Sequence, residues 1–141
     1  MRAEEVASLL GEVYLLTGQF DRAVHNFEKS LARPGVGMEY AARSRWGLAR
    51  ILKQEGRLKR ALHHAVNAFV LGNHPVYTPR AMMLAVEILR EQDKTEEART
   101  TWKELQVRFP AFAEQQRGSD VVDGLDDAES GPAANGKGAG G

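Results

Sequence analysis

Apolar residues recur every three or four positions along most of this chain, the spacing that places side chains on one face of an α-helix. Gly and Pro interrupt the pattern at regular intervals, and Thr78 and Pro79 together form a helix start signal. The pattern therefore predicts six helices and a shorter seventh, at about residues 3–16, 20–32, 38–54, 57–71, 78–92, 95–108 and 111–117.

The stretch from Leu10 to Phe27 returns twice, starting at Leu48 and at Ala85, with periods of 38 and 37 residues. Each copy predicts a pair of antiparallel helices. Small residues are expected where the two axes approach, at Gly11, Ala23, Ala49, Ala61 and Ala98. The turns need a left-handed backbone, which glycine adopts without steric cost and aspartate at some cost; these positions are Gly18, Gly56 and Asp93.

The order Leu-Gly-x-x-Tyr, then Gly-x-Phe, then Ala-x-x-x-Phe resembles the tetratricopeptide repeat. The first copy matches most fully, while the third is degenerate and keeps Ala98, Trp102 and a closing Pro110. The resemblance covers about residues 3–110. It implies an all-α, right-handed superhelical solenoid of three antiparallel hairpins, within a domain of residues 1–117. The links are longer than the typical repeat period requires, as in bacterial envelope members of the family.

Charge divides the chain into two parts. Residues 119–141 hold five acidic residues and one lysine, whereas the rest holds 18 basic and 14 acidic residues. From Gly118 onward the composition is first acidic and then rich in Gly and Ala, so residues 118–141 are predicted to be a disordered tail. Val121, Val122 and Leu125 give this stretch of the tail its apolar side chains, so it is the part of the tail that is expected to bind a partner.

The resemblance also implies a binding groove, because the first helix of each hairpin lines the inner surface of such solenoids. The positions on that face follow helical spacing and are Glu5, Ser8, Glu12, Leu15, Arg43, Trp46, Arg50, Lys53, Arg80, Met83, Glu87 and Arg90. We expect an exposed Trp46 surrounded by cations, with Glu5 and Glu12 making the opposite end acidic. The alternative is a solvated face with Trp46 folded back into the core.

Catalysis finds no support in the sequence. It contains no Gly-x-Ser-x-Gly, phosphate-loop or His-Glu-x-x-His motif and no cysteine, and no two of its four histidines have the i, i+4 spacing of a ligand pair. We therefore expect no enzyme activity, no cofactor and no metal. The sequence has no apolar run long enough to span a membrane and no signal-peptide pattern, which predicts a cytoplasmic protein.

The resemblance implies a non-catalytic protein-interaction module, a scaffold or adaptor that binds an acidic or amphipathic segment of a protein partner in its groove. A second hypothesis is self-assembly, in which weakly capped repeat ends stack into homo-oligomers. A third is RNA binding through the basic stripe. The RNA hypothesis is the weaker one, because the groove also holds acids and Trp46 is its one clear stacking surface.

Overall fold

The computed structural model describes residues 2–33 and 35–126. Within these residues the chain forms seven α-helices and a final 3-10 turn at Asp120–Val122. The helices are α1 (Ala3–Leu16), α2 (Phe20–Leu31), α3 (Met38–Gln54), α4 (Leu58–Val70), α5 (Tyr77–Glu91), α6 (Thr95–Arg108) and α7 (Pro110–Gln116). The predicted order and type of the elements are confirmed.

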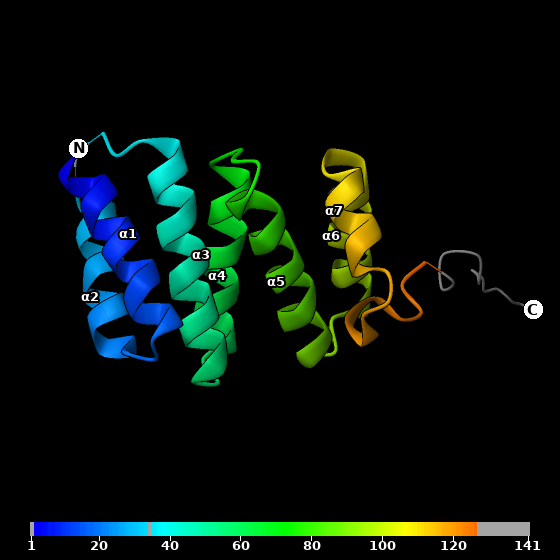
Figure 1. Ribbon diagram of the computed structural model, residues 1–141. Coiled ribbons are helices and arrows are strands. Elements are labelled where there is room, and N and C mark those ends of the chain that lie inside the picture. Colours follow the sequence, from blue (N-terminus) through cyan, green and yellow to red (C-terminus); the bar gives the residue numbers. More distant parts are fainter. Residues whose placement is uncertain (1, 34, 127–141) are drawn as a thin grey trace, which may run out of the picture.

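The helices pack in sequential pairs, α1 with α2, α3 with α4 and α5 with α6, and each pair lies against the next (Figure 1). Helices α1, α3 and α5 also contact one another along one layer, and α2, α4 and α6 lie behind them. Helix α7 folds over α6 at the C-terminal end. The all-α stack of helical hairpins predicted from the repeats is therefore confirmed.

The three hairpins share one turn geometry. Gly18, Gly56 and Asp93 have φ angles of 77°, 81° and 59°. In each turn the next residue donates its backbone N–H to the carbonyl five positions earlier, at 2.8 Å for Gln19 to Tyr14, 2.9 Å for Arg57 to Leu52 and 2.8 Å for Lys94 to Leu89. This bond, with that from the left-handed residue to the carbonyl three positions back, is the Schellman motif that ends an α-helix.

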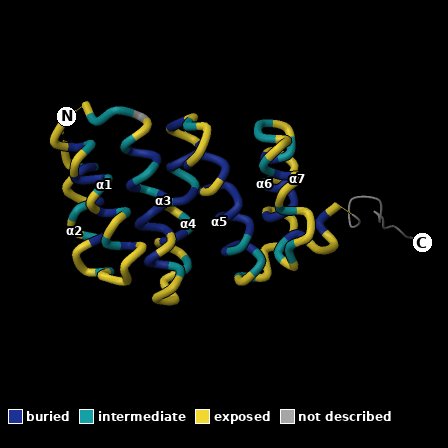
Figure 2. The backbone as a smooth tube through the Cα atoms, in the orientation of Figure 1, coloured by how far each residue is buried: buried dark blue, intermediate teal, exposed yellow. Residues whose placement is uncertain are grey.

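Small and large residues alternate across the helix interfaces. Ala23, Ala61 and Ala98, which occupy equivalent positions in the three hairpins, are completely buried. Beyond them, the Phe27 ring fills the space beside Gly11 and Gly47: a Cβ atom on either glycine would lie within 2.5 Å of a ring carbon. Helix α5, at the centre of the stack, is buried along most of its length (Figure 2).

Residues 118–126 correct the prediction of a disordered tail that begins at Gly118. Val122 and Leu125 are buried, and the carbonyl groups of Asp123 and Leu125 accept hydrogen bonds from Arg90 and Arg99. Trp102 Nε1 donates to Asp126 Oδ1 at 3.0 Å, and Arg117 pairs with the other oxygen of that carboxylate at 2.7 Å. The segment is thus held by two buried apolar side chains, by hydrogen bonds to its backbone and by the pairing of the Asp126 carboxylate. The rest of the predicted tail, residues 127–141, lies outside the described residues.

The start of α5 also differs from the prediction. Thr78 does not cap the helix; it is buried inside the first turn, and its hydroxyl accepts the backbone N–H of His74 at 2.7 Å. The ring nitrogen Nδ1 of His74 instead accepts the N–H groups of Val76 at 3.0 Å and Tyr77 at 3.2 Å. The His74 side chain therefore caps the start of α5. The helix begins one residue earlier than predicted, with Tyr77 as its first residue.

Candidate functional site

A hollow of about 470 Å³ opens between α3, α5 and α7. Its lining combines cations, one acid and apolar side chains: Trp46, Arg50, Lys53, Gln54, Arg80, Met83, Leu84, Glu87 and Phe112. Helices α3 and α5 contribute most of this lining, and α7 contributes Phe112. Six of the residues predicted to form the groove line this hollow.

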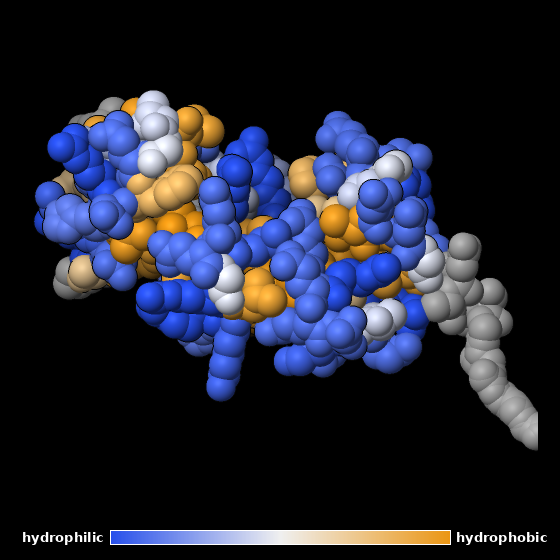
Figure 3. All heavy atoms as spheres, turned by 90° about the horizontal axis from the view of Figure 1, so that it is seen from below, coloured by the Kyte–Doolittle hydropathy of each residue, from blue (hydrophilic) through white to orange (hydrophobic). Residues whose placement is uncertain are grey.

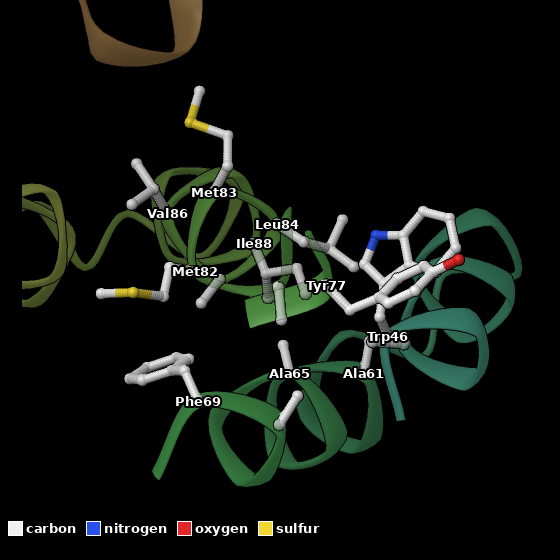
Figure 4. Close-up of a cluster of buried hydrophobic side chains, with 14 of the residues drawn as sticks. Trp46, Ala61, Ala65, Phe69, Tyr77, Met82, Met83, Leu84, Val86 and Ile88 are labelled. Atoms are coloured by element: carbon white, nitrogen blue, oxygen red, sulfur yellow. The ribbon is translucent and has the colours of Figure 1, made fainter. Parts of the chain in front are cut away.

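Trp46 lies beneath the cationic side chains of the hollow and is buried, with 6% of its surface exposed. Its ring packs against that of Tyr77 from α5, with 5.4 Å between centroids and 50° between planes (Figure 4). The expectation of an exposed Trp46 is therefore wrong, because the first turn of α5 brings a second aromatic ring against the indole. The alternative, in which Trp46 folds back into the core, holds for this residue: Trp46 belongs to the buried hydrophobic cluster, where its ring lies between α3 and α5.

Two guanidinium groups cover the rest of the indole. The Cζ atoms of Arg50 and Arg80 each lie 5.3 Å from the Trp46 ring centroid, and Arg80 lies 5.4 Å from that of Tyr77. Cations over aromatic faces are attracted by the ring quadrupole, by about 0.5–1 kcal/mol each at an exposed site. A ligand would therefore contact guanidinium groups that are stacked on aromatic rings.

Glu12 sits within the cationic surface instead of at an opposite, acidic end. Its carboxylate lies 3.4 Å from Arg43 Nε and 4.0 Å from Arg80, and it accepts a 2.6 Å hydrogen bond from the Tyr77 hydroxyl. Arg43 also donates to the Ser8 hydroxyl at 3.1 Å. Burial, together with the hydrogen bond to Glu12, raises the pKa of Tyr77. Within this half-buried network, the Glu12 carboxylate neutralises much of the positive charge of Arg43.

Lys53 is likewise neutralised, by Glu91 at 3.0 Å and Glu87 at 3.6 Å from the facing helix α5. The hydrogen bond to Glu91 raises the pKa of Lys53. By contrast, Arg50 is exposed and forms no ion pair with any residue that the structure describes. The positive charge of the hollow is therefore concentrated on Arg50 and, in part, on Arg80.

The structure separates the other predicted groove residues from the hollow. Arg90 turns toward the C-terminal segment and donates to the Asp123 carbonyl at 2.8 Å. Ser8 and Leu15 are buried, and Glu5 and Glu12 lie outside the lining. Met83 does line the hollow and points away from α4 (Figure 4).

The sequence did not predict three residues that line the hollow, Gln54, Leu84 and Phe112, or Tyr77, which packs on Trp46. Tyr77 falls in a segment predicted as a link, and the signal that places it in a helix is the capping by His74, which depends on the folded loop. Phe112 belongs to α7, whose position over the hollow depends on how the last hairpin packs. The sequence predicted Phe112 to be an apolar residue of a helix, but it did not show which residues Phe112 would pack against.

Among the described residues, no group of three or more His, Cys, Asp or Glu side chains is arranged to hold a metal ion. No helix in that part of the chain combines the length and the apolar character needed to cross a membrane.

The paired helices, the repeated Schellman turns and the equivalent buried alanines define a helical-repeat protein. The family model of the tetratricopeptide repeat matches residues 5–24 and 42–67. The chain therefore contains tetratricopeptide repeats in α1–α2 and α3–α4, and α5 and α6 form a third hairpin of the same architecture beyond the matched segments. No curated protein and no solved structure matches the chain.

Proposed function

We propose that this protein is a non-catalytic scaffold or adaptor that binds an acidic or amphipathic peptide segment of a protein partner in the hollow between α3, α5 and α7. The observation that supports this most is the pair of guanidinium groups over Trp46, one of which, Arg50, has no acidic partner among the described residues. Tetratricopeptide domains in general are protein-interaction modules, which agrees with this role.

The lining suggests how such a segment binds. A carboxylate of the ligand pairs with Arg50 and draws Arg80, which is 43% exposed, away from its 4.0 Å contact with Glu12. Apolar ligand side chains contact Met83 and the half-buried Phe112. Arginine forms bidentate pairs with carboxylates, so a ligand with an Asp or Glu beside an apolar residue satisfies both halves of the hollow.

Trp46 then acts as a support and not as the anchor that inserts into a ligand pocket. Its ring holds Arg50 and Arg80 in position from below, which lowers the entropy lost when those side chains bind a carboxylate. Affinity and partner choice follow from this rigid pair of cations together with the apolar wall of α5 and α7. Replacing Trp46 weakens binding by freeing the arginines.

The experiment is a selection of displayed 12-residue random peptides on the immobilised protein, followed by titration of the selected peptides in solution. We expect enriched sequences to carry Asp or Glu next to an apolar residue. Arg50→Glu should weaken their binding by about tenfold or more, because it reverses the charge that faces the ligand. The matched control is Lys59→Glu, which makes the same change at an exposed site on α4 outside the hollow.

Raised salt should weaken binding to the wild-type protein and have a smaller effect on the residual binding to Arg50→Glu. The proposal is overturned if selection yields basic peptides, or if Lys59→Glu and Arg50→Glu weaken binding equally. Loss of helix content in Arg50→Glu by circular dichroism would identify a folding defect. In that case Arg50→Gln, which keeps a long polar side chain, takes its place in the titration.

A further inference from the structure

Helix α1 exposes an apolar stripe on the side of the molecule away from α3. Val6, Leu10, Val13 and Leu16 are 38%, 41%, 53% and 72% exposed, and Leu9 lies half-buried between them. Figure 3 shows hydrophobic side chains reaching the surface over this N-terminal hairpin. Single exposed apolar residues are ordinary on proteins, but a stripe along a whole helix marks an interaction surface.

The repeat indicates what this face is built to contact. The positions equivalent to Val6, Leu10 and Val13 are buried in both later hairpins, where the preceding hairpin covers them: Ser44, Leu48 and Ile51 in α3, and Ala81, Ala85 and Ile88 in α5. Helix packing is thus the ordinary use of this face in the fold. In α1 the same face is open among the described residues.

The opposite end of the stack does not offer a matching surface. There α7 and the 3-10 turn lie against α6 and α5, and Arg99 and Trp102 hold the chain at Leu125 and Asp126. A head-to-tail stack of copies would have to displace these contacts. This arrangement favours a closed pairing of like surfaces over the open rods that stacking of both repeat ends would produce.

The residue types on the stripe select the form of that pairing. Val6, Leu9, Val13 and Leu16 are spaced by three, four and three positions, so they occupy successive a and d positions of a heptad. In a parallel coiled coil, valine at a with leucine at d favours two strands over three or four. A parallel pairing around a two-fold axis places each residue of the stripe beside its own equivalent, valine against valine and leucine against leucine.

We propose that α1 is a self-association surface, on which a second copy of this chain pairs α1 with α1 in parallel around a two-fold axis. The seam is only 14 residues long, far below a standard interface, so the dimer is weak, with a dissociation constant of about 10 µM to 1 mM. The peptide-binding hollow lies between α3, α5 and α7, outside this seam, so the two copies present two independent hollows.

The test is sedimentation equilibrium of the full chain from about 10 µM to 1 mM. We expect the average mass to rise from monomer toward dimer with concentration. Val13→Glu should keep the protein monomeric throughout, with unchanged helix content. The matched control is Val107→Glu, which places the same charge at an 81% exposed valine on α6 and should dimerise like the wild type.

Orientation is tested by cross-linking, because the chain has no cysteine of its own. Val6→Cys should form a disulfide dimer on mild oxidation, since a parallel two-fold seam places position 6 against itself, and Val107→Cys should not. A wild-type protein that stays monomeric at every concentration overturns the proposal, as does dimerisation that Val13→Glu leaves unchanged. A dimer sensitive to Val13→Glu in which Val6→Cys fails to cross-link overturns the parallel pairing.

Discussion

Tyr77 of α5 donates a hydrogen bond to Glu12 of α1, which lies 65 positions earlier, with 2.6 Å between the hydroxyl and Oε1. The bond joins the first hairpin directly to the third, across the face of α3. Arg43 of α3 takes part from below: its guanidinium pairs with Glu12 at 3.4 Å and lies 5.1 Å from the Tyr77 ring centroid. The layer formed by α1, α3 and α5 is therefore held by one polar network beside the proposed binding hollow.

Tyr77→Phe is expected to lower the free energy of unfolding by about 1–3 kcal/mol, the range for a hydrogen bond to a charged group in a partly buried setting. The ring still packs on Trp46, so only the hydroxyl is lost. Urea denaturation followed by circular dichroism measures the change. The control is Tyr14→Phe, because the half-buried Tyr14 hydroxyl donates no hydrogen bond to a described residue. Equal effects of the two substitutions would show that the network adds no stability.

Gly47→Ala is expected to destabilise the fold by about 1–3 kcal/mol through overpacking. The new Cβ would lie 2.3 Å from Phe27 Cε2 and Cζ, and the buried ring has little room to move. Thermal unfolding of the single variants and of the pair Gly47→Ala with Phe27→Leu forms a double-mutant cycle. The pair should be more stable than the sum of the single effects predicts. Additive effects would mean that the alanine methyl finds space elsewhere.

Stability is expected to fall as the pH is lowered from about 7 to about 5, with His64 and His74 contributing. Burial lowers the pKa of both histidines below its ordinary value of 6.5. The unfolded chain therefore binds protons more readily in this window, so the contribution is present above about pH 6.5 and is lost as pH falls toward the folded-state pKa.

For His74 the contacts act in the same direction as burial, since a protonated Nδ1 cannot accept the N–H groups of Val76 and Tyr77. His74→Asn keeps an acceptor at this position that does not titrate. The capping role is tested by comparing the melting temperatures of the variant and the wild type at pH 7 and at pH 5. The variant should lose less stability on acidification, and an unchanged pH dependence would contradict the capping role.

Ending the chain after Gly118 is expected to cost about 2–4 kcal/mol relative to ending it after Asp126. The shorter chain loses the buried Val122 and Leu125 and leaves Trp102 Nε1 without the Asp126 carboxylate. Trp102 fluorescence should shift to longer wavelength in the shorter chain, while comparison of the two truncations isolates residues 119–126. Identical melting temperatures would show that this segment adds nothing to the stability of the last hairpin.

The repeats made the helices predictable from the sequence. Each turn requires glycine, or aspartate in the third copy, and each close approach of two helices requires alanine. These requirements are local, so the residues near each position are enough to reveal them. Gly18, Gly56 and Asp93 do adopt the left-handed conformation, and Ala23, Ala61 and Ala98 are buried as expected. Helical spacing, together with the resemblance to the repeat family, also placed Arg50, Arg80 and Met83 on one face of α3 and α5.

Contacts between hairpins were decided by the tertiary structure. The spacing of Trp46 placed it on the same face as Arg50, but the aromatic ring that buries it comes from the far end of a loop, after His74 caps α5. In the same way, the acidic residues 120–126 resembled a disordered segment, but in the fold Arg90 and Arg99 bind its backbone carbonyls and Arg117 pairs with Asp126. Helical periodicity is a property of one segment and can be read from that segment. Burial and charge pairing depend on which distant residues meet, so only the packed chain determined that Arg50 keeps an unpaired charge among the described residues while Lys53 and Glu12 do not.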